Sequence, residues 1–184
     1  TSDTDFYLYY GNASASDASS PNDVWDSNYK LVMHMGPSLE DSTSNGNDGT
    51  NYGTTLGLAS DGYYRSFDGV DDYINLGSDV DFGLTDKINI EVYQKCSAFK
   101  KGRLFNRHEA SSYGYMLAEF SGNIEWKISK NGTDWNGGMT TLNSYVLNEE
   151  LYIVGNYNGS YMRVYFDGVE DTGKDFPVTL SGNI

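Results

Sequence analysis

Oxygen-bearing side chains are concentrated in two polar stretches of this sequence. One stretch runs from Asp41 through Asn45 to Asp48, and the other includes Asp68 and Asp71. Ca²⁺ is bound by about six to eight oxygens, which closely spaced Asp and Asn side chains can supply. Asp41, Asn45, Asp68 and Asp71 are therefore candidate metal ligands. The same side chains also suit turns in which they bond their own backbone, and the residues alone leave both interpretations open.

One particular calcium motif, the EF-hand, is excluded by the residue types. Asp41, Thr43 and Asn45 match the start of an EF-hand loop. However, Tyr52 stands where that loop requires a bidentate Glu, and no helical pattern flanks the stretch.

Aromatic residues in polar loops are the second group of residues that could bind a ligand. Sugar faces stack on exposed rings, and sugar hydroxyls pair with Asp, Asn and Arg side chains. Trp135 fits best, because it lies in a loop sequence of Asn, Gly, Thr and Asp. Since loop aromatics commonly cap the end of a β-sandwich, a structural role for Trp135 stays open. Weaker candidates for ligand binding are Tyr63, Tyr64, Tyr113 and Arg107.

Residue sets that carry catalysis are not found in the sequence. Retaining glycosidases need two carboxyl groups about 5 Å apart, and the E-x-D-x-x-E strand motif of the jelly-roll glucanases is absent. Glu91 has no acidic partner two or four residues later, and Glu149 and Glu150 would point to opposite faces of a strand. Cys96, the single cysteine, has no recognisable hydrolase context. We therefore predict that the chain is not an enzyme.

Composition excludes two classes of partner. The 184 residues carry 12 basic and 26 acidic side chains, a formal net charge of −14. Such a chain repels phosphate backbones, so we predict no nucleic-acid binding. No apolar run approaches the roughly 18 residues of a membrane span, so we predict no membrane insertion.

Alternating apolar and polar residues recur along the chain and predict strands. Such strands are expected at Tyr29 to Met35, Ile88 to Tyr93 and Asn123 to Ser129, the last with Trp126 in the core. Asn-Gly at 158–159 and Asp-Gly at 167–168 predict tight hairpin turns. Further strands are expected at 6–10, 73–76, 103–107, 113–120, 151–157 and 161–166, and a long polar loop at 38–60. Many short strands separated by turns indicate an all-β sandwich or barrel.

Two separated motifs resemble one known family. FDGVDDY at 67–73 follows the polar loop DSTSNGNDG at 41–49, and the hairpin YIVGNYNGSYMRVYFDG lies at 152–168. Together they resemble the LamG-like (laminin G-like) domains of the concanavalin A-like lectin and glucanase superfamily. The resemblance implies a two-sheet antiparallel jelly-roll β-sandwich, glycan binding, and a structural Ca²⁺ that ties Asp41 or the 67–72 turn to a closing strand. That closing strand is not present after Ile184, and Tyr93 replaces a customary Trp.

The front of the chain has a resemblance of its own. Residues 5–35 are similar to the tail of an uncharacterised β-domain that precedes LamG-like domains in surface proteins and phage virion proteins. We therefore expect residues 1–28 to be an extension from a preceding domain, and residues 29–184 to form the sandwich.

These observations predict a non-catalytic adhesion or recognition module of a larger protein at an extracellular, cell or virion surface. Carbohydrate is the expected ligand class. The alternative is a structural exterior domain of a virion or filament, which would exchange strands with neighbouring subunits.

Overall fold

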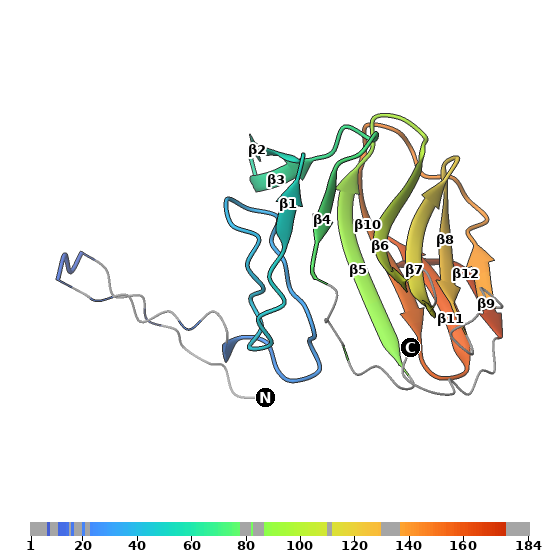
Figure 1. Ribbon diagram of the computed structural model, residues 1–184, viewed down its shortest axis with the longest axis horizontal. Coiled ribbons are helices and arrows are strands. Elements are labelled where there is room, and N and C mark those ends of the chain that lie inside the picture. The colour runs from blue at the N-terminus through green and yellow to red at the C-terminus, as the bar shows by residue number, and fades with distance from the viewer. Residues whose placement is uncertain are drawn as a thin grey trace. The chain divides into compact units, whose positions relative to one another are not determined.

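The protein is described by a computed structural model of residues 1–184 (Figure 1). The described residues are 7, 11–14, 16, 20, 23–77, 82, 87–109, 112–129 and 137–175. Their regular elements are strands paired in antiparallel sheets, and no α-helix occurs among them. The predicted all-β class is confirmed. Two compact units are present: Thr1–Phe67 with Tyr73–Ser78, and Asp68–Asp72 with Asp79–Ile184.

The second unit contains two four-stranded antiparallel sheets that face each other (Figure 1). The first sheet has the order β12-β11-β10-β5, and the second has the order β6-β7-β8-β9. The first comprises β5 (Ile88–Lys95), β10 (Glu150–Tyr157), β11 (Tyr161–Phe166) and β12 (Val169–Asp175). The second comprises β6 (Lys101–Glu109), β7 (Ser112–Phe120), β8 (Asn123–Ile128) and β9 (Gly137–Thr140).

Turn residues explain why consecutive strands pair. Asp167 and Gly168 both have positive φ angles, 49° and 80°, as the tight turn between β11 and β12 requires. Ser121 and Gly122, in the turn between β7 and β8, also have positive φ angles, 52° and 92°. Between β10 and β11, the Asn158 side-chain oxygen accepts the backbone N–H of Ser160 and Tyr161. The predicted hairpins are confirmed.

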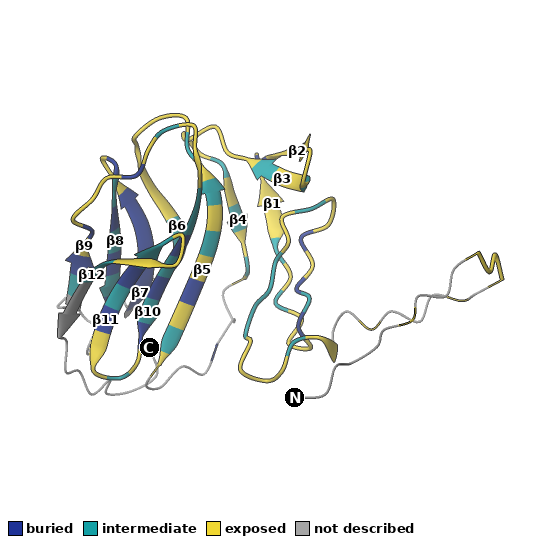
Figure 2. Cartoon of the chain, turned by 180° about the vertical axis from the view of Figure 1, so that it is seen from behind, coloured by how far each residue is buried: buried dark blue, intermediate teal, exposed yellow. Residues whose placement is uncertain are grey.

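Alternation along the strands builds the core between the two sheets. Trp126 of β8 is fully buried, and its indole N–H donates to the Asn156 carbonyl of the opposite sheet at 3.1 Å. Gly155 of β10 lets the sheets approach, because a Cβ there would lie 3.0 Å from Leu117 and 3.2 Å from Trp126. Buried positions follow every second residue of β8 and β10 (Figure 2). The predicted core role of Trp126 is confirmed.

The first unit contains two small antiparallel pairs. β1 (Thr50–Tyr52) pairs with β4 (Tyr73–Asn75), and β2 (Thr55–Ala59) pairs with β3 (Gly62–Ser66). β1 and β2 lie within the stretch predicted to be a long loop, so that prediction was too coarse. Polar side chains that resemble those of a loop can also fill short, exposed strands, because such strands bury little surface.

The predicted strand from Tyr29 to Met35 is wrong. No strand pairs with this segment among the described residues, because neighbouring side chains bind its backbone instead. Asp41 accepts the Val32 N–H at 3.0 Å, and the Asn47 amide donates to the Lys30 carbonyl at 2.7 Å. Met35 also has a positive φ of 55°, which interrupts extended backbone. The predicted strand at 6–10 lies outside the described residues except for Tyr7, and the boundary at residue 28 stays a prediction.

Candidate functional site

The outward side of the first sheet carries a concentration of aromatic, amide and acidic residues. Period-two geometry turns Ile90, Ile153 and Met162 into the core and leaves their neighbours outside. We call the outward set the polar face. It consists of Asn89, Glu91, Tyr93 and Lys95 of β5, Glu150, Tyr152, Val154 and Asn156 of β10, Tyr161, Arg163 and Tyr165 of β11, and Glu170 of β12.

Strand register places these side chains in rows across the sheet. Tyr93 lies opposite Tyr152, and Asn89 lies opposite Asn156. Asn156 in turn pairs with Arg163 of β11. Directly opposed residues have Cβ atoms about 5 Å apart, so each row forms one continuous surface.

Hydrogen bonds fix the orientation of the central side chains. The Tyr152 hydroxyl donates to one oxygen of the Glu91 carboxylate, and the Asn89 amide donates to the other at 2.5 Å. The Asn156 amide donates to the Asn89 side-chain oxygen at 3.3 Å. The Tyr93 hydroxyl donates to Glu150 at 2.8 Å. These bonds hold the polar groups of β5 and β10 in set directions before any ligand arrives.

Exposed rings lie toward the two ends of the polar face. Tyr93 is 60% exposed and Tyr161 is 41% exposed. The Arg163 guanidinium lies 5.2 Å from the centre of the Tyr161 ring and pairs with Glu170 at 3.5 Å. From the register, the two rings are separated by about six residues along the strands, which is about 20 Å. A face of that length can contact an extended ligand.

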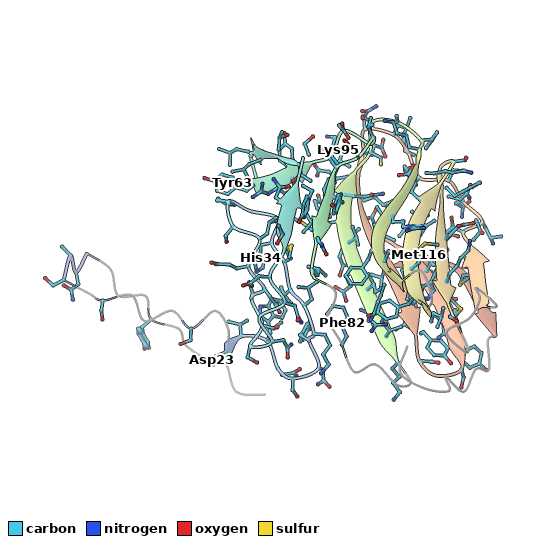
Figure 3. All side chains as sticks on the ribbon, in the orientation of Figure 1. Asp23, His34, Tyr63, Phe82, Lys95 and Met116 are labelled. Carbon is cyan, nitrogen blue, oxygen red and sulfur yellow. The ribbon has the colours of Figure 1, made fainter. Side chains whose placement is uncertain are left out.

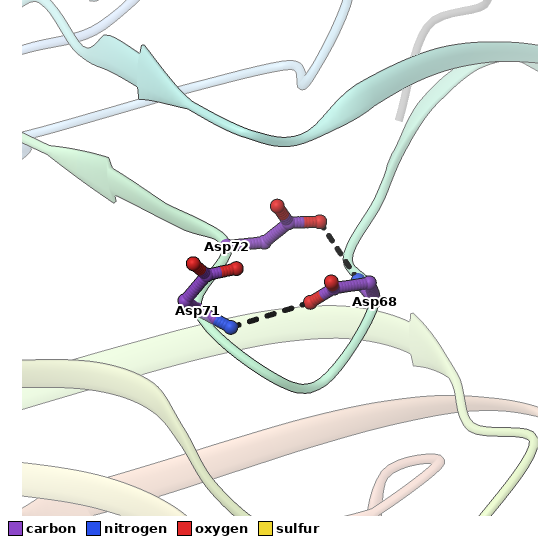
Figure 4. A group of neighbouring side chains, drawn as sticks. All are labelled: Asp68, Asp71 and Asp72. Atoms are coloured by element: carbon purple, nitrogen blue, oxygen red, sulfur yellow. Dashed lines mark hydrogen bonds between the residues drawn. The ribbon is translucent and has the colours of Figure 1, made fainter.

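A turn in the second unit gathers three carboxylates, and Figure 4 shows them. Asp68, Asp71 and Asp72 each offer an oxygen within 4.8 Å of the others. Asp68 accepts the N–H groups of Val70 at 2.7 Å and Asp71 at 3.3 Å. The bond from Val70, with further help from Lys100, lowers the pKa of Asp68. The predicted ligands Asp68 and Asp71 thus lie together, and Asp72 is a third candidate that the sequence did not single out.

Asp41 and Asn45 belong to the first unit, in a loop that satisfies its own polar groups. The buried Asp41 carboxylate accepts the N–H groups of Val32, Thr43 and Asn47 and the Thr43 hydroxyl. Burial by itself would raise the pKa of Asp41, but these hydrogen bonds outweigh it and lower the pKa. The Asn45 amide donates to the carbonyls of Tyr29 and Lys30. This geometry is that of the self-bonded turn, and calcium binding by Asp41 and Asn45 stays a prediction.

Three of the predicted sugar-binding residues, Tyr63, Tyr64 and Arg107, have described side chains, and sugar binding by all five stays a prediction. Trp135 lies outside the described residues, as does the side chain of Tyr113, whose backbone is part of β7. Arg107 is half-buried on β6. Tyr63 and Tyr64 are exposed on β3 of the first unit, where successive positions point to opposite faces, and Figure 3 labels Tyr63.

Sequence reasoning missed the polar face because its residues alternate with core residues in ordinary strands. The available signal was chemical, since the outward positions of residues 88–95 and 150–157 hold Asn, Glu and Tyr in both segments. Only the pairing of β5 with β10 makes these one surface.

A buried polar cluster explains the single cysteine. Glu119 is 6% exposed and accepts the Lys100 N–H at 2.9 Å and the Cys96 thiol at 3.2 Å. Burial, and then the bond to Glu119, raises the pKa of Cys96. Burial also raises the pKa of the nearby Tyr145 hydroxyl. The thiol is therefore held in its protonated form, which is a poor nucleophile.

Comparison with known proteins identifies the class of fold. No protein-family model matches the sequence, and no curated protein matches it significantly. Among solved structures, domain 4 of AbnA, an extracellular arabinanase from Geobacillus stearothermophilus in complex with arabinotriose, matches with a TM-score of 0.60 and 16% identity. That match covers 83% of this chain and 79% of the other.

Two botulinum neurotoxin structures match over part of their length. One is a structure of type C, a neurotoxin whose cell entry is described as dependent on interaction with two ganglioside molecules. It matches with a TM-score of 0.55 and 12% identity, over 79% of this chain and 38% of the toxin chain. The DC binding domain in complex with rat synaptotagmin II matches with a TM-score of 0.58 and 14% identity, over 84% of this chain and 41% of the toxin chain. This chain spans about two fifths of those toxin chains. It has the antiparallel β-sandwich fold of these binding domains.

No helix in the described part of the chain is both long enough and apolar enough to cross a bilayer.

Proposed function

We propose that this protein is a non-catalytic carbohydrate-binding module of a larger extracellular or surface protein, and that the polar face binds the glycan. The observation that carries the proposal is the exposed Tyr93 ring beside the hydrogen-bonded set of Glu91, Asn89 and Tyr152. The solved structures with this fold support it, since one is in complex with arabinotriose and another is described with gangliosides. Membership of the LamG-like group is part of the proposal.

Each component of the polar face has a role in sugar binding. The Tyr93 ring offers an apolar surface for the C–H face of a sugar ring. The Glu91 carboxylate and the Asn89 and Asn156 amides pair with hydroxyl groups, because they combine acceptors and donors within one small area. Since hydrogen bonds already orient these side chains, binding loses less conformational freedom than it would with free side chains.

Spacing of the acidic residues supports binding without hydrolysis. Glu91 lies opposite Val154, whereas Glu150 lies opposite Lys95, four positions further along β5. Four residues of strand span about 13 Å. Glycosidases hold their two carboxyl groups about 5 to 9.5 Å apart, so the backbone positions do not suit this pair for catalysis.

The structural alternative rests on the sheet edges. β5 pairs with β10 over all eight of its residues without a bulge and is an edge strand of its sheet in the described part of the chain. A regular edge strand can accept a strand from another subunit. A virion or filament domain would use this edge for assembly.

Replacement of Tyr93 by alanine tests the proposal. We expect a glycan array to identify ligands of the full chain, and Tyr93→Ala to weaken their binding at least about tenfold through loss of ring stacking. Tyr7→Ala, at another exposed tyrosine, is the matched control and should bind normally. Absence of glycan binding, together with concentration-dependent ordered assembly, would instead support the structural alternative.

A further inference from the structure

The centre of the polar face carries a carboxylate that has no cation among its hydrogen-bond partners in the described part of the chain. Glu91 receives its bonds from the Tyr152 hydroxyl and the Asn89 amide. Across the sheet from it, at the paired positions, stand the uncharged residues Val154 and Tyr165. These neutral donors therefore orient the Glu91 carboxylate but do not compensate its negative charge.

The nearest cation on β11 is already engaged. Arg163 pairs with Glu170 at 3.5 Å and stacks on Tyr161. At the other end of the face, Lys95 of β5 lies directly opposite Glu150. Each cationic position of the polar face therefore has an acidic neighbour, whereas Glu91 has neutral ones.

This charge pattern discriminates between classes of sugar. A carboxylate accepts hydrogen bonds from sugar hydroxyl groups, but it repels a carboxylate or sulfate placed within a few ångströms. The net charge of −14 on the whole chain acts in the same direction. An arginine that is free to form a bidentate bond with an anionic group would have the opposite effect.

We infer that the polar face selects an uncharged glycan, and that Glu91 is the residue that determines this specificity. The inference rests on the proposed function and adds the chemical class of the ligand. Glu91 accepts hydroxyl hydrogen bonds from the sugar and excludes sialylated, uronate-containing and sulfated chains.

An array that contains neutral oligosaccharides and their sialylated, uronate-containing and sulfated counterparts tests the inference. We expect the full chain to bind neutral members, with charged counterparts of the same backbone bound at least about tenfold more weakly. Glu91→Gln keeps the shape of the side chain but removes its charge, so it should reduce this discrimination severalfold. Glu125→Gln, on β8 of the other sheet, makes the same change in net charge and should preserve the discrimination.

Salt provides a second measurement that does not depend on a variant. Repulsion by Glu91 predicts that binding of a charged counterpart strengthens as ionic strength rises, whereas binding of the neutral glycan stays constant. Discrimination that is independent of salt and unchanged in Glu91→Gln would overturn the inference. So would preferential binding of anionic glycans that Tyr93→Ala abolishes, although that result would uphold the proposed function. Failure to bind any glycan would overturn both.

Discussion

Asp41 shows how a single buried carboxylate can organise a polar loop. Its two oxygens receive four hydrogen bonds from residues on both sides of it in sequence. An ionised carboxylate has about four lone-pair sites, so the loop itself supplies a nearly complete set of donors. The motif that resembles a calcium loop therefore has a structural explanation in this unit.

Asp41→Asn should destabilise the first unit by about 1–3 kcal/mol, because the new amide group would face N–H donors that need an acceptor. Denaturant unfolding measures the loss. Asp48→Asn is the control, since Asp48 uses one oxygen to accept the Asp41 N–H and asparagine retains that acceptor. Equal losses in the two variants would contradict this account.

The pH dependence of the same variant provides an independent check. The folded-state pKa of Asp41 is below the ordinary value of 3.8. The stability that its ionised carboxylate contributes is therefore fully present above pH 3.8. The contribution is lost as the pH falls through the lower folded-state pKa. The advantage of the natural sequence over Asp41→Asn should therefore shrink below pH 3.8.

Cys96 should react slowly in the native protein. Its pKa is raised above the ordinary 9.0, so the folded state favours the neutral thiol, and we expect alkylation at pH 8 to be at least about tenfold slower than in denaturant. The stability that the protonated Cys96 thiol contributes is present below pH 9.0 and is lost as the pH rises through the folded-state pKa. Mass spectrometry after timed alkylation measures the rate. A native rate equal to the denatured rate would contradict the buried cluster with Glu119.

At the scale of elements, the Asp68–Asp72 turn gathers three carboxylates that could hold a cation, the group of this kind found among the described residues. If the proposed structural Ca²⁺ binds there, a concentration one hundred times Kd stabilises the second unit by about 2.7 kcal/mol. We therefore expect calcium to raise the melting temperature and a chelator to reverse the effect. Asp71→Asn should abolish the shift, whereas Asp61→Asn, at an exposed position outside the turn, should not. Unchanged melting in excess chelator and in calcium would exclude the ion.

Strand prediction succeeded where alternation and turn chemistry agree. β8, β10 and β11 combine a clear two-residue period with Gly-containing turns, and all three form. The segment from Tyr29 to Met35 has the same period but lacks a partner strand among the described residues, because the side chains of Asp41 and Asn47 bind its backbone. Periodicity reports which side chains can share a face, and it does not report which backbone groups will pair.

At the scale of the whole molecule, the amino-acid sequence alone determined the all-β class, the hairpins and the core role of Trp126. These depend on neighbouring residues, whose alternation and turn preferences are local properties. Only the tertiary structure decided that Asn89, Glu91 and Tyr93 join Tyr152 and Asn156 in one face, because β5 and β10 are more than fifty residues apart. The same holds for Glu119 beside Cys96, which are far apart in sequence. Such sites arise from strand register and burial, which are set by the packing of the complete sheets.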